Sequence, residues 1–110
     1  MSDINTDLRD LSYWIDAGNA DRCEEAATWG RLAKVAEEGG EVIAAYIGAT
    51  GQNPRKGITH DRDDVEDELL DVAVTALGAV MHLHGNAPDF DVTGVLSEHV
   101  ESLVKRAGLR

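Results

Sequence analysis

Apolar residues recur every three or four positions in four stretches of the chain, which is the spacing of amphipathic helices. We predict helices over about Asp7 to Ala17, Asp21 to Ile47, Asp61 to His84 and Thr93 to Arg106. Turn-like segments separate them at 17–21, 50–60 and 84–91, and the last two contain the only prolines. No stretch alternates with a period of two, so we expect no strands and an all-α fold.

The second predicted helix has two different faces. Its apolar stripe, which predicts a core face, comprises Leu32, Val35, Ala36, Gly39, Val42, Ile43, Tyr46 and Ile47. Glu37, Glu38 and Glu41 lie off this stripe, with Gly40 and the alanines 44–45 beside them. Because small side chains leave room, we expect another helix to approach closely on this side.

The third predicted helix is apolar around most of its circumference from Leu69 to Leu83, which indicates burial on several sides. One narrow polar strip interrupts it, comprising Asp64, Glu68, Asp71, Thr75, Gly78 and His82. An unpaired buried carboxylate costs several kcal/mol. Glu68 and Asp71 are therefore expected to face a cation or a hydrogen-bond network.

Composition narrows the choice of partners. The chain has 110 residues, enough for one domain spanning 1–110, with 21 acidic side chains against 10 Lys and Arg and a net charge of −11. This balance argues against a nucleic-acid polymer or an anionic membrane as partner, but not against a phosphate ligand that arrives with metal ions. So small a domain buries a modest core, which favours self-association.

The sequence predicts neither a secretory signal nor a metal site built on cysteines. Cys23 is the single cysteine, so neither an internal disulfide nor a cysteine-based zinc site is expected. The first ten residues do not form a secretory signal, and no apolar run approaches the roughly 20 residues of a membrane span. We therefore expect a cytoplasmic protein.

The spacing of the acids favours a hard divalent cation. One helix offers E-x-x-E at 38–41 and the other E-x-x-D at 68–71, and residues three apart share a helix face. Mg²⁺ prefers oxygen ligands and is usually held by a few carboxylates plus substrate phosphates. We predict one or two Mg²⁺ ions between these helices, with Mn²⁺ as a substitute. The acids at 63–67 are interpreted instead as favourable charges at a helix start.

The pattern E-E-x-x-E at 37–41, followed after 26 intervening residues by E-x-x-D at 68–71, resembles the MazG-like nucleoside triphosphate pyrophosphohydrolases. The segments "LAKVAEEGGEVIAAYIG" and "DELLDVAVTALGAV" are similar to that family's two core helices, and the resemblance covers residues 22–84. It implies a bundle of four or five helices whose core helices pack across a dimer or tetramer interface. It also implies Mg²⁺-dependent hydrolysis of a (d)NTP to the monophosphate and pyrophosphate, in nucleotide-pool housekeeping.

The resemblance also assigns roles to the acids. The implied metal ligands are Glu38, Glu41, Glu68 and Asp71. Glu37 and Glu38 are the implied catalytic residues, with Glu37 either supporting the ligands or orienting water. The pair Gly39-Gly40 costs about 1 kcal/mol per glycine in a helix interior, which close helix packing or room for the ligand would explain.

Four residues are candidates for binding the substrate. Arg55 and Lys56 lie in the loop between the two acidic helices, where they either fold over the phosphates or form an ordinary basic loop. Lys34 lies one turn before Glu38 and either meets a phosphate or pairs with that glutamate. Trp29 precedes the acidic motif and either stacks on the base or belongs to the core.

Two other functions compete with this one, and the first lacks the motif that it requires. A carboxylate-bridged di-iron bundle requires E-x-x-H on two helices, and no glutamate here has a histidine three residues later. A non-catalytic acidic helical bundle that binds other proteins would have solvated carboxylates. That alternative predicts neither a thermal shift with Mg²⁺ or Mn²⁺ nor turnover of any nucleotide.

Overall fold

Four helices account for nearly all of the chain, as the hydrophobic pattern predicts. A computed structural model describes residues 3–110 and contains α1 (Ile4–Gly18), α2 (Glu24–Thr50), α3 (Arg62–Leu83) and α4 (Val92–Arg106). No strand occurs within this range. The all-helical fold class is therefore confirmed, and each predicted helix exists with ends shifted by up to three residues.

Local sequence signals fix the helix ends that matter for the rest of the molecule. Asp61 caps α3 by accepting from the backbone N–H of Asp64, whose own side chain accepts from the Asp61 N–H, forming a capping box. Gly51 ends α2 in the left-handed conformation, with φ of 67°. Asp91 caps α4 by accepting from the Gly94 N–H.

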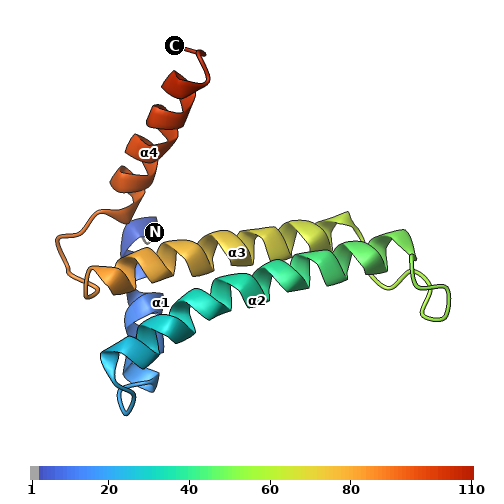
Figure 1. The fold of residues 1–110 in the computed structure, drawn as a ribbon, viewed down its shortest axis with the longest axis horizontal. Coiled ribbons are helices and arrows are strands. Elements are labelled where there is room, and N and C mark those ends of the chain that lie inside the picture. Colours follow the sequence, from blue (N-terminus) through green and yellow to red (C-terminus); the bar gives the residue numbers. More distant parts are fainter. Residues whose placement is uncertain (1–2) are drawn as a thin grey trace.

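The helices α2 and α3 run side by side as a long hairpin, and α1 crosses both near one end (Figure 1). The buried positions of α2 include Arg31, Ala45 and Gly48, and Glu38 lies on the same line of the helix, seven residues from Arg31 and from Ala45. At Gly48 the loop that leads into α3 packs so closely that a Cβ atom would collide with the side chains of Thr59 and His60. Of the small residues expected to let another helix approach, Ala45 is buried, whereas Gly40 and Ala44 are exposed.

The buried apolar core is small and lies at one end of the hairpin. Leu8 of α1, Met81 of α3 and Val92 of α4 form it, with Leu77 and Phe90 among the partly buried residues around them. From this junction α4 projects away from the other helices (Figure 1). A single chain therefore forms a hairpin with two attached helices, and only α2 and α3 pack along most of their length.

The apolar stripe of α2, which was expected to form the core, is only partly buried in a single chain: Val35, Gly39 and Val42 are half-buried. Ile43 is 62% exposed, and Leu32, Tyr46 and Ile47 are also exposed. The expected burial of α3 on several sides is likewise only partial, since Ala79 and Met81 are buried whereas Leu70 is 58% exposed. The line of α2 that is buried or half-buried includes Val35, Glu38, Val42 and Ala45, so it runs between the apolar stripe and the acidic side and leaves much of both exposed. Among the described residues, no helix is both long and apolar enough to cross a membrane.

Candidate metal centre and adjoining cavity

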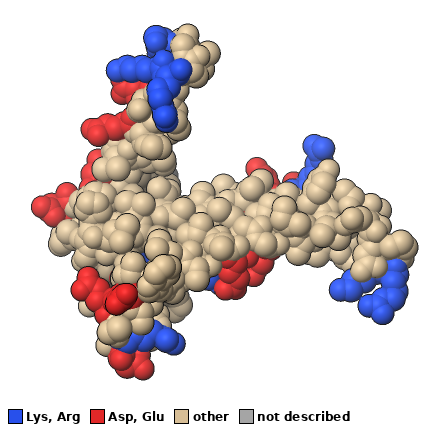
Figure 2. All heavy atoms as spheres, in the orientation of Figure 1, with Lys and Arg blue, Asp and Glu red and all other residues tan. Residues whose placement is uncertain are grey.

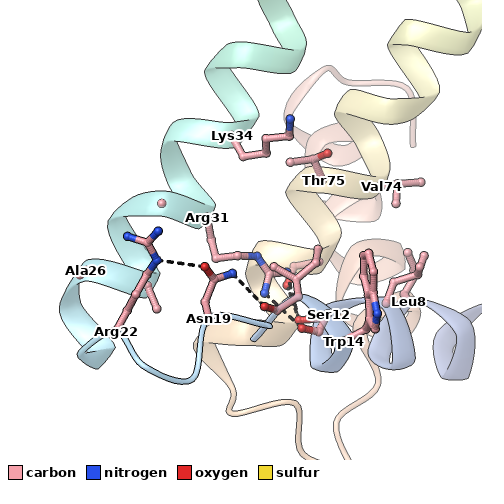
Figure 3. A pocket seen from close by; sticks show the side chains of 15 residues that line it. Leu8, Ser12, Trp14, Asn19, Arg22, Ala26, Arg31, Lys34, Val74 and Thr75 are labelled. Carbon is pink, nitrogen blue, oxygen red and sulfur yellow. Dashed lines mark hydrogen bonds between the residues drawn. The ribbon is translucent and has the colours of Figure 1, made fainter. Parts of the chain in front are cut away.

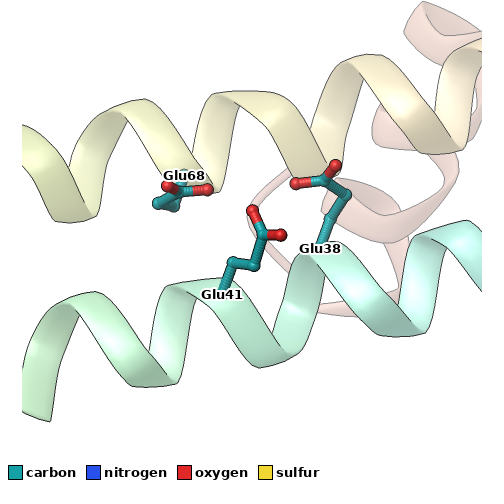
Figure 4. Close-up of side chains that lie close together, drawn as sticks. All are labelled: Glu38, Glu41 and Glu68. Carbon is teal, nitrogen blue, oxygen red and sulfur yellow. The ribbon is translucent and has the colours of Figure 1, made fainter.

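Three of the predicted carboxylates meet between α2 and α3. Glu38 and Glu41 lie three residues apart on α2, and Glu68 faces them from α3 (Figure 4). One carboxylate oxygen from each of these residues lies within 4.8 Å of the other two. The hairpin thus brings together hard oxygen donors from two elements, which is the arrangement that a divalent cation requires. We call these three residues the acidic cluster.

The acidic cluster is partly shielded from water and short of partners. Glu38 Oε2 and Glu68 Oε2 are buried, and neither has a hydrogen-bond partner in the described part of the chain. Lys34 Nζ lies 3.3 Å from Glu38 Oε1 and 3.0 Å from Glu37 Oε1, so the predicted pairing of Lys34 with Glu38 is present. Because Lys34 reaches only one carboxylate of the acidic cluster, it leaves two buried oxygens unsatisfied.

Like charge dominates the electrostatics of the acidic cluster. The pKa of Glu41 is raised above its usual range, chiefly by the negative charge of Glu38 and further by desolvation and by Glu68. The pKa of Lys34 is also raised, because its ammonium group donates to Glu37 and to Glu38. Both shifts express the same imbalance, in which several carboxylates share one cation.

The other predicted site residues lie outside the acidic cluster. Asp71 is exposed on α3 and is not one of the three clustered acids. Glu37 is 60% exposed at its side chain and contacts Lys34. Arg55 and Lys56 belong to the loop at the free end of the hairpin, where Figure 2 shows Lys and Arg side chains gathered. That loop begins at Gly51, ten residues after Glu41, which corresponds to about 15 Å along the helix axis.

A cavity adjoins the acidic cluster. It has a volume of about 610 Å³ and lies where α1 meets α2 and α3 (Figure 3). Trp14, Leu11 and Val74 contribute apolar walls, and Lys34 lines the cavity as well as contacting Glu38. Trp29, the predicted stacking residue, is exposed and is not among the residues that line it. The aromatic side chain at the cavity is that of Trp14.

A buried polar network, which sequence reasoning missed, forms one end of the cavity. Arg31 NH1 donates to Asp16 Oδ1 at 3.0 Å, and its NH2 donates to Ser12 Oγ at 3.0 Å. Asp16 Oδ2 also lies 2.8 Å from His82 Nδ1 and accepts from Asn86 at 2.8 Å. The one available signal was the position of Arg31, seven residues before Glu38 on the same line of α2. Its partners come from other helices, so periodicity alone did not reveal them.

The pair Gly39-Gly40 lies next to open space in the single chain. A Cβ atom added at either glycine would have no neighbour within 4 Å. Close packing within the chain therefore does not explain these glycines. Two explanations of this glycine pair therefore remain: the open space accommodates a ligand, or a second copy of the chain packs closely there.

No protein-family model, curated protein or solved structure matches the chain. The function is therefore inferred from two features of the structure itself. One is the acidic cluster with its unpartnered oxygens, and the other is the adjoining cavity.

Proposed function

We propose that the chain is a MazG-like, Mg²⁺-dependent nucleoside triphosphate pyrophosphohydrolase that works as a dimer or tetramer. The observation that carries the proposal is the meeting of Glu38, Glu41 and Glu68 with two buried carboxylate oxygens that lack partners. Buried carboxylates without partners are unfavourable, and an oxygen-seeking cation would satisfy them. An acidic bundle that only binds other proteins has no need for such burial.

The donor set fits a hard cation. All three clustered groups are carboxylates, which suit Mg²⁺ and Mn²⁺ rather than soft metals. Asp71 lies three residues after Glu68, and we assign it to the same metal through substrate or water. When bound, the metal would neutralise phosphate charge and make a bound water more acidic. Glu38, Glu41 and Glu68 would hold it, while Glu37, outside the acidic cluster, is the candidate for orienting the attacking water.

The cavity supports the same proposal, because it could hold the base of a nucleotide whose phosphates lie at the acidic cluster. Lys34 lines the cavity and contacts the acidic cluster, so the two features share one wall. From Arg31 to Glu38 the helix rises about 10 Å. A nucleotide whose base occupies the cavity would direct its phosphates along α2 toward the carboxylates. Arg55 and Lys56 are too far along the hairpin to serve their own chain's acidic cluster, so we assign them to phosphate binding only if a second copy presents them.

The test is a panel of the eight common nucleoside triphosphates with Mg²⁺, scored for pyrophosphate against phosphate release. We expect pyrophosphate and the monophosphate from at least one of them. Glu41→Gln and Asp71→Asn should lower turnover at least a hundredfold while the protein stays folded. Glu66→Gln is the matched control, since Glu66 is an exposed acid of α3 outside the acidic cluster. Full activity in Glu41→Gln would refute the ligand assignment.

A second measurement separates the enzyme from the non-catalytic acidic bundle. Mg²⁺ or Mn²⁺ should raise the thermal midpoint of the wild-type protein, because an ion that binds only the folded state stabilises it. Glu41→Gln should reduce that increase, whereas Glu66→Gln should keep it. If no nucleotide is hydrolysed and no divalent ion shifts the midpoint, the acidic bundle is the better description.

A further inference from the structure

The cavity differs in charge from the rest of the molecule. The chain carries 21 Asp and Glu against 10 Lys and Arg, yet the cavity is lined by Arg22, Arg31 and Lys34 and by no acidic residue. Its remaining walls are mostly apolar, including the side chains of Leu11 and Trp14. A cavity of this kind suits a flat apolar ring that carries electronegative oxygen atoms, rather than a cationic or donor-rich ligand.

Arg31 is the cavity residue whose position is most firmly held. Its side chain is 8% exposed and forms an ion pair with Asp16. Its NH1 and NH2 groups make three hydrogen bonds to Ser12 and Asp16, of five N–H donors in a guanidinium. Gly78 permits this position, since a Cβ atom there would lie 3.0 Å from Arg31 NH2. Nε–H and one N–H of NH2 therefore have no hydrogen-bond partner in the described part of the chain.

Side-chain acceptors on the same walls are limited to Ser12, Asn19 and Thr75. The Asn19 side chain already donates to the carbonyl oxygen of Ile15 and accepts from Arg22 Nε. Ser12 Oγ accepts from Arg31 and lies within hydrogen-bond distance of Gly78 O and Asn86 Oδ1. An amino group on a ligand ring would consequently find few partners, whereas a carbonyl oxygen would find the guanidinium.

We propose that Arg31 selects substrates by donating to a ring carbonyl oxygen of a nucleobase bound in the cavity. The expected substrates carry a keto oxygen where cytosine and adenine carry an amino group, as uracil, thymine, guanine and hypoxanthine do. A guanidinium only donates, so an amino group at that position leaves it unpaired and the ring poorly accommodated. This inference rests on the proposed function, which identifies the ligand of the cavity as a nucleotide with a phosphate chain. It adds which bases are accepted.

The test compares substrate pairs that differ at this position. We expect kcat/KM for dUTP to exceed that for dCTP at least tenfold, and dITP to exceed dATP similarly. Arg31→Met removes the donors and should bring both ratios to within about threefold of one, mainly by slowing the keto substrates. Arg62→Met is the matched control, because Arg62 is an exposed arginine of α3 that does not line the cavity. The control should keep the ratios of the wild type.

Two further measurements keep the inference testable if Arg31→Met does not fold. Arg31→Lys keeps a positive charge beside Asp16 but has no planar fork, so it should lower both ratios at least threefold. Calorimetric titration of the wild type with dUMP and dCMP in EDTA needs no turnover and should give at least tenfold tighter binding of dUMP. If kcat/KM for the keto and amino substrates of each pair differs by less than twofold, this inference is wrong, whereas the proposed function stands.

The binding measurement also separates this inference from the proposed function. Preferential binding of dUMP in a protein without turnover would support the cavity assignment and contradict the reaction. No turnover together with equal or undetectable binding of both monophosphates would contradict both.

Discussion

Glu41 makes the metal-free protein sensitive to pH. Its pKa in the folded state is raised by the charge of Glu38 first, then by desolvation and by Glu68. The unfolded chain has an ordinary glutamate pKa of 4.5, so the folded state holds the proton more tightly. The stabilising contribution of protonated Glu41 is fully present below that value and is lost as the pH rises through the folded pKa.

We therefore expect Glu41→Gln to stabilise the metal-free protein increasingly as the pH rises through this window. Urea denaturation in EDTA at several pH values between about 4 and 7 measures the difference from wild type. Glu37→Gln is the control, since Glu37 is exposed and lies outside the acidic cluster. A constant difference between wild type and Glu41→Gln across these pH values would contradict the prediction.

Asp16 shows the opposite dependence on pH. Burial by itself raises its pKa, but hydrogen bonds from His82 and Asn86 and the charges of His82 and Arg31 outweigh burial, so the pKa lies below the ordinary value of 3.8. The ionised carboxylate therefore contributes stability that is present above pH 3.8 and is lost as the pH falls through the lower folded pKa.

Asp16→Asn should lower the free energy of unfolding at pH 7 by about 3 kcal/mol, because it leaves the buried Arg31 without its carboxylate. Chemical denaturation measures the loss. Asp10→Asn, an exposed carboxylate on the same helix, should change the stability by less than about 0.5 kcal/mol. Equal stability of the two variants would mean that the network of Arg31, Asp16 and His82 contributes little to the fold.

At the scale of the helices, two glycines of α2 should respond oppositely to the same substitution. Gly48→Ala places a methyl group against the side chains of Thr59 and His60, and such overpacking costs about 1–3 kcal/mol. Gly40→Ala meets no atom within 4 Å, so it should gain up to about 1 kcal/mol of helix propensity. Thermal or urea denaturation of both variants measures the two signs. If Gly40→Ala instead lowers the stability, the added methyl group must meet a second copy of the chain at that position.

Helix existence was predictable from the sequence, whereas helix orientation was not. The breaks at 17–21, 50–60 and 84–91 and the cap at Asp61 gave four helices with small errors at their ends. Periodicity identified two faces of α2, and the acidic side was expected to face the other acidic helix. The line that faces α3 contains Glu38 and Ala45 but lies between the acidic side and the apolar stripe, because Val35 and Val42 are half-buried while Gly40 and Ala44 are exposed. Close approach depends on side-chain volume, which an apolar pattern does not record.

The candidate site was predictable where its residues share a helix face. Glu38 and Glu41 are three apart, and a partner acid on the facing helix was expected, which Glu68 provides. The cavity was not predictable, because its residues come from three helices and from the turn between α1 and α2, which meet at one end of the hairpin. Trp14 and Arg31 acquire their roles from the crossing angle of α1, and no local pattern encodes that angle.

The whole molecule exposes more surface than a compact monomer does. Its accessible area is 7983 Å² for a mass of 11.8 kDa, where a compact protein of that mass exposes about 5,900 Å². Its radius of gyration is 16.9 Å, against about 13 Å for a compact chain of this length. Figure 2 shows a broad area without charged side chains along the hairpin. The excess of about 2,000 Å² is of the size that one subunit buries in an obligate assembly.

We expect the chain to self-associate through the exposed apolar face of α2, as the proposed function requires. Sedimentation velocity should show a dimer or tetramer for the wild type at micromolar concentration. Ile43→Glu places a charge in the middle of that face, where Ile43 is 62% exposed in the single chain. It should shift the protein toward the monomer, because burying an unpaired carboxylate at an interface costs several kcal/mol.

Ile58→Glu is the matched control for this face. Ile58 is 74% exposed, lies in the loop between α2 and α3 and is not one of the residues of the apolar stripe. The same substitution there should leave the assembly intact, so a change of net charge alone would not account for dissociation of Ile43→Glu. If the wild-type protein sediments as a folded monomer, the apolar face of α2 stays exposed to water in the native protein. In that case the open space beside Gly39-Gly40 would belong to a ligand and not to a second chain.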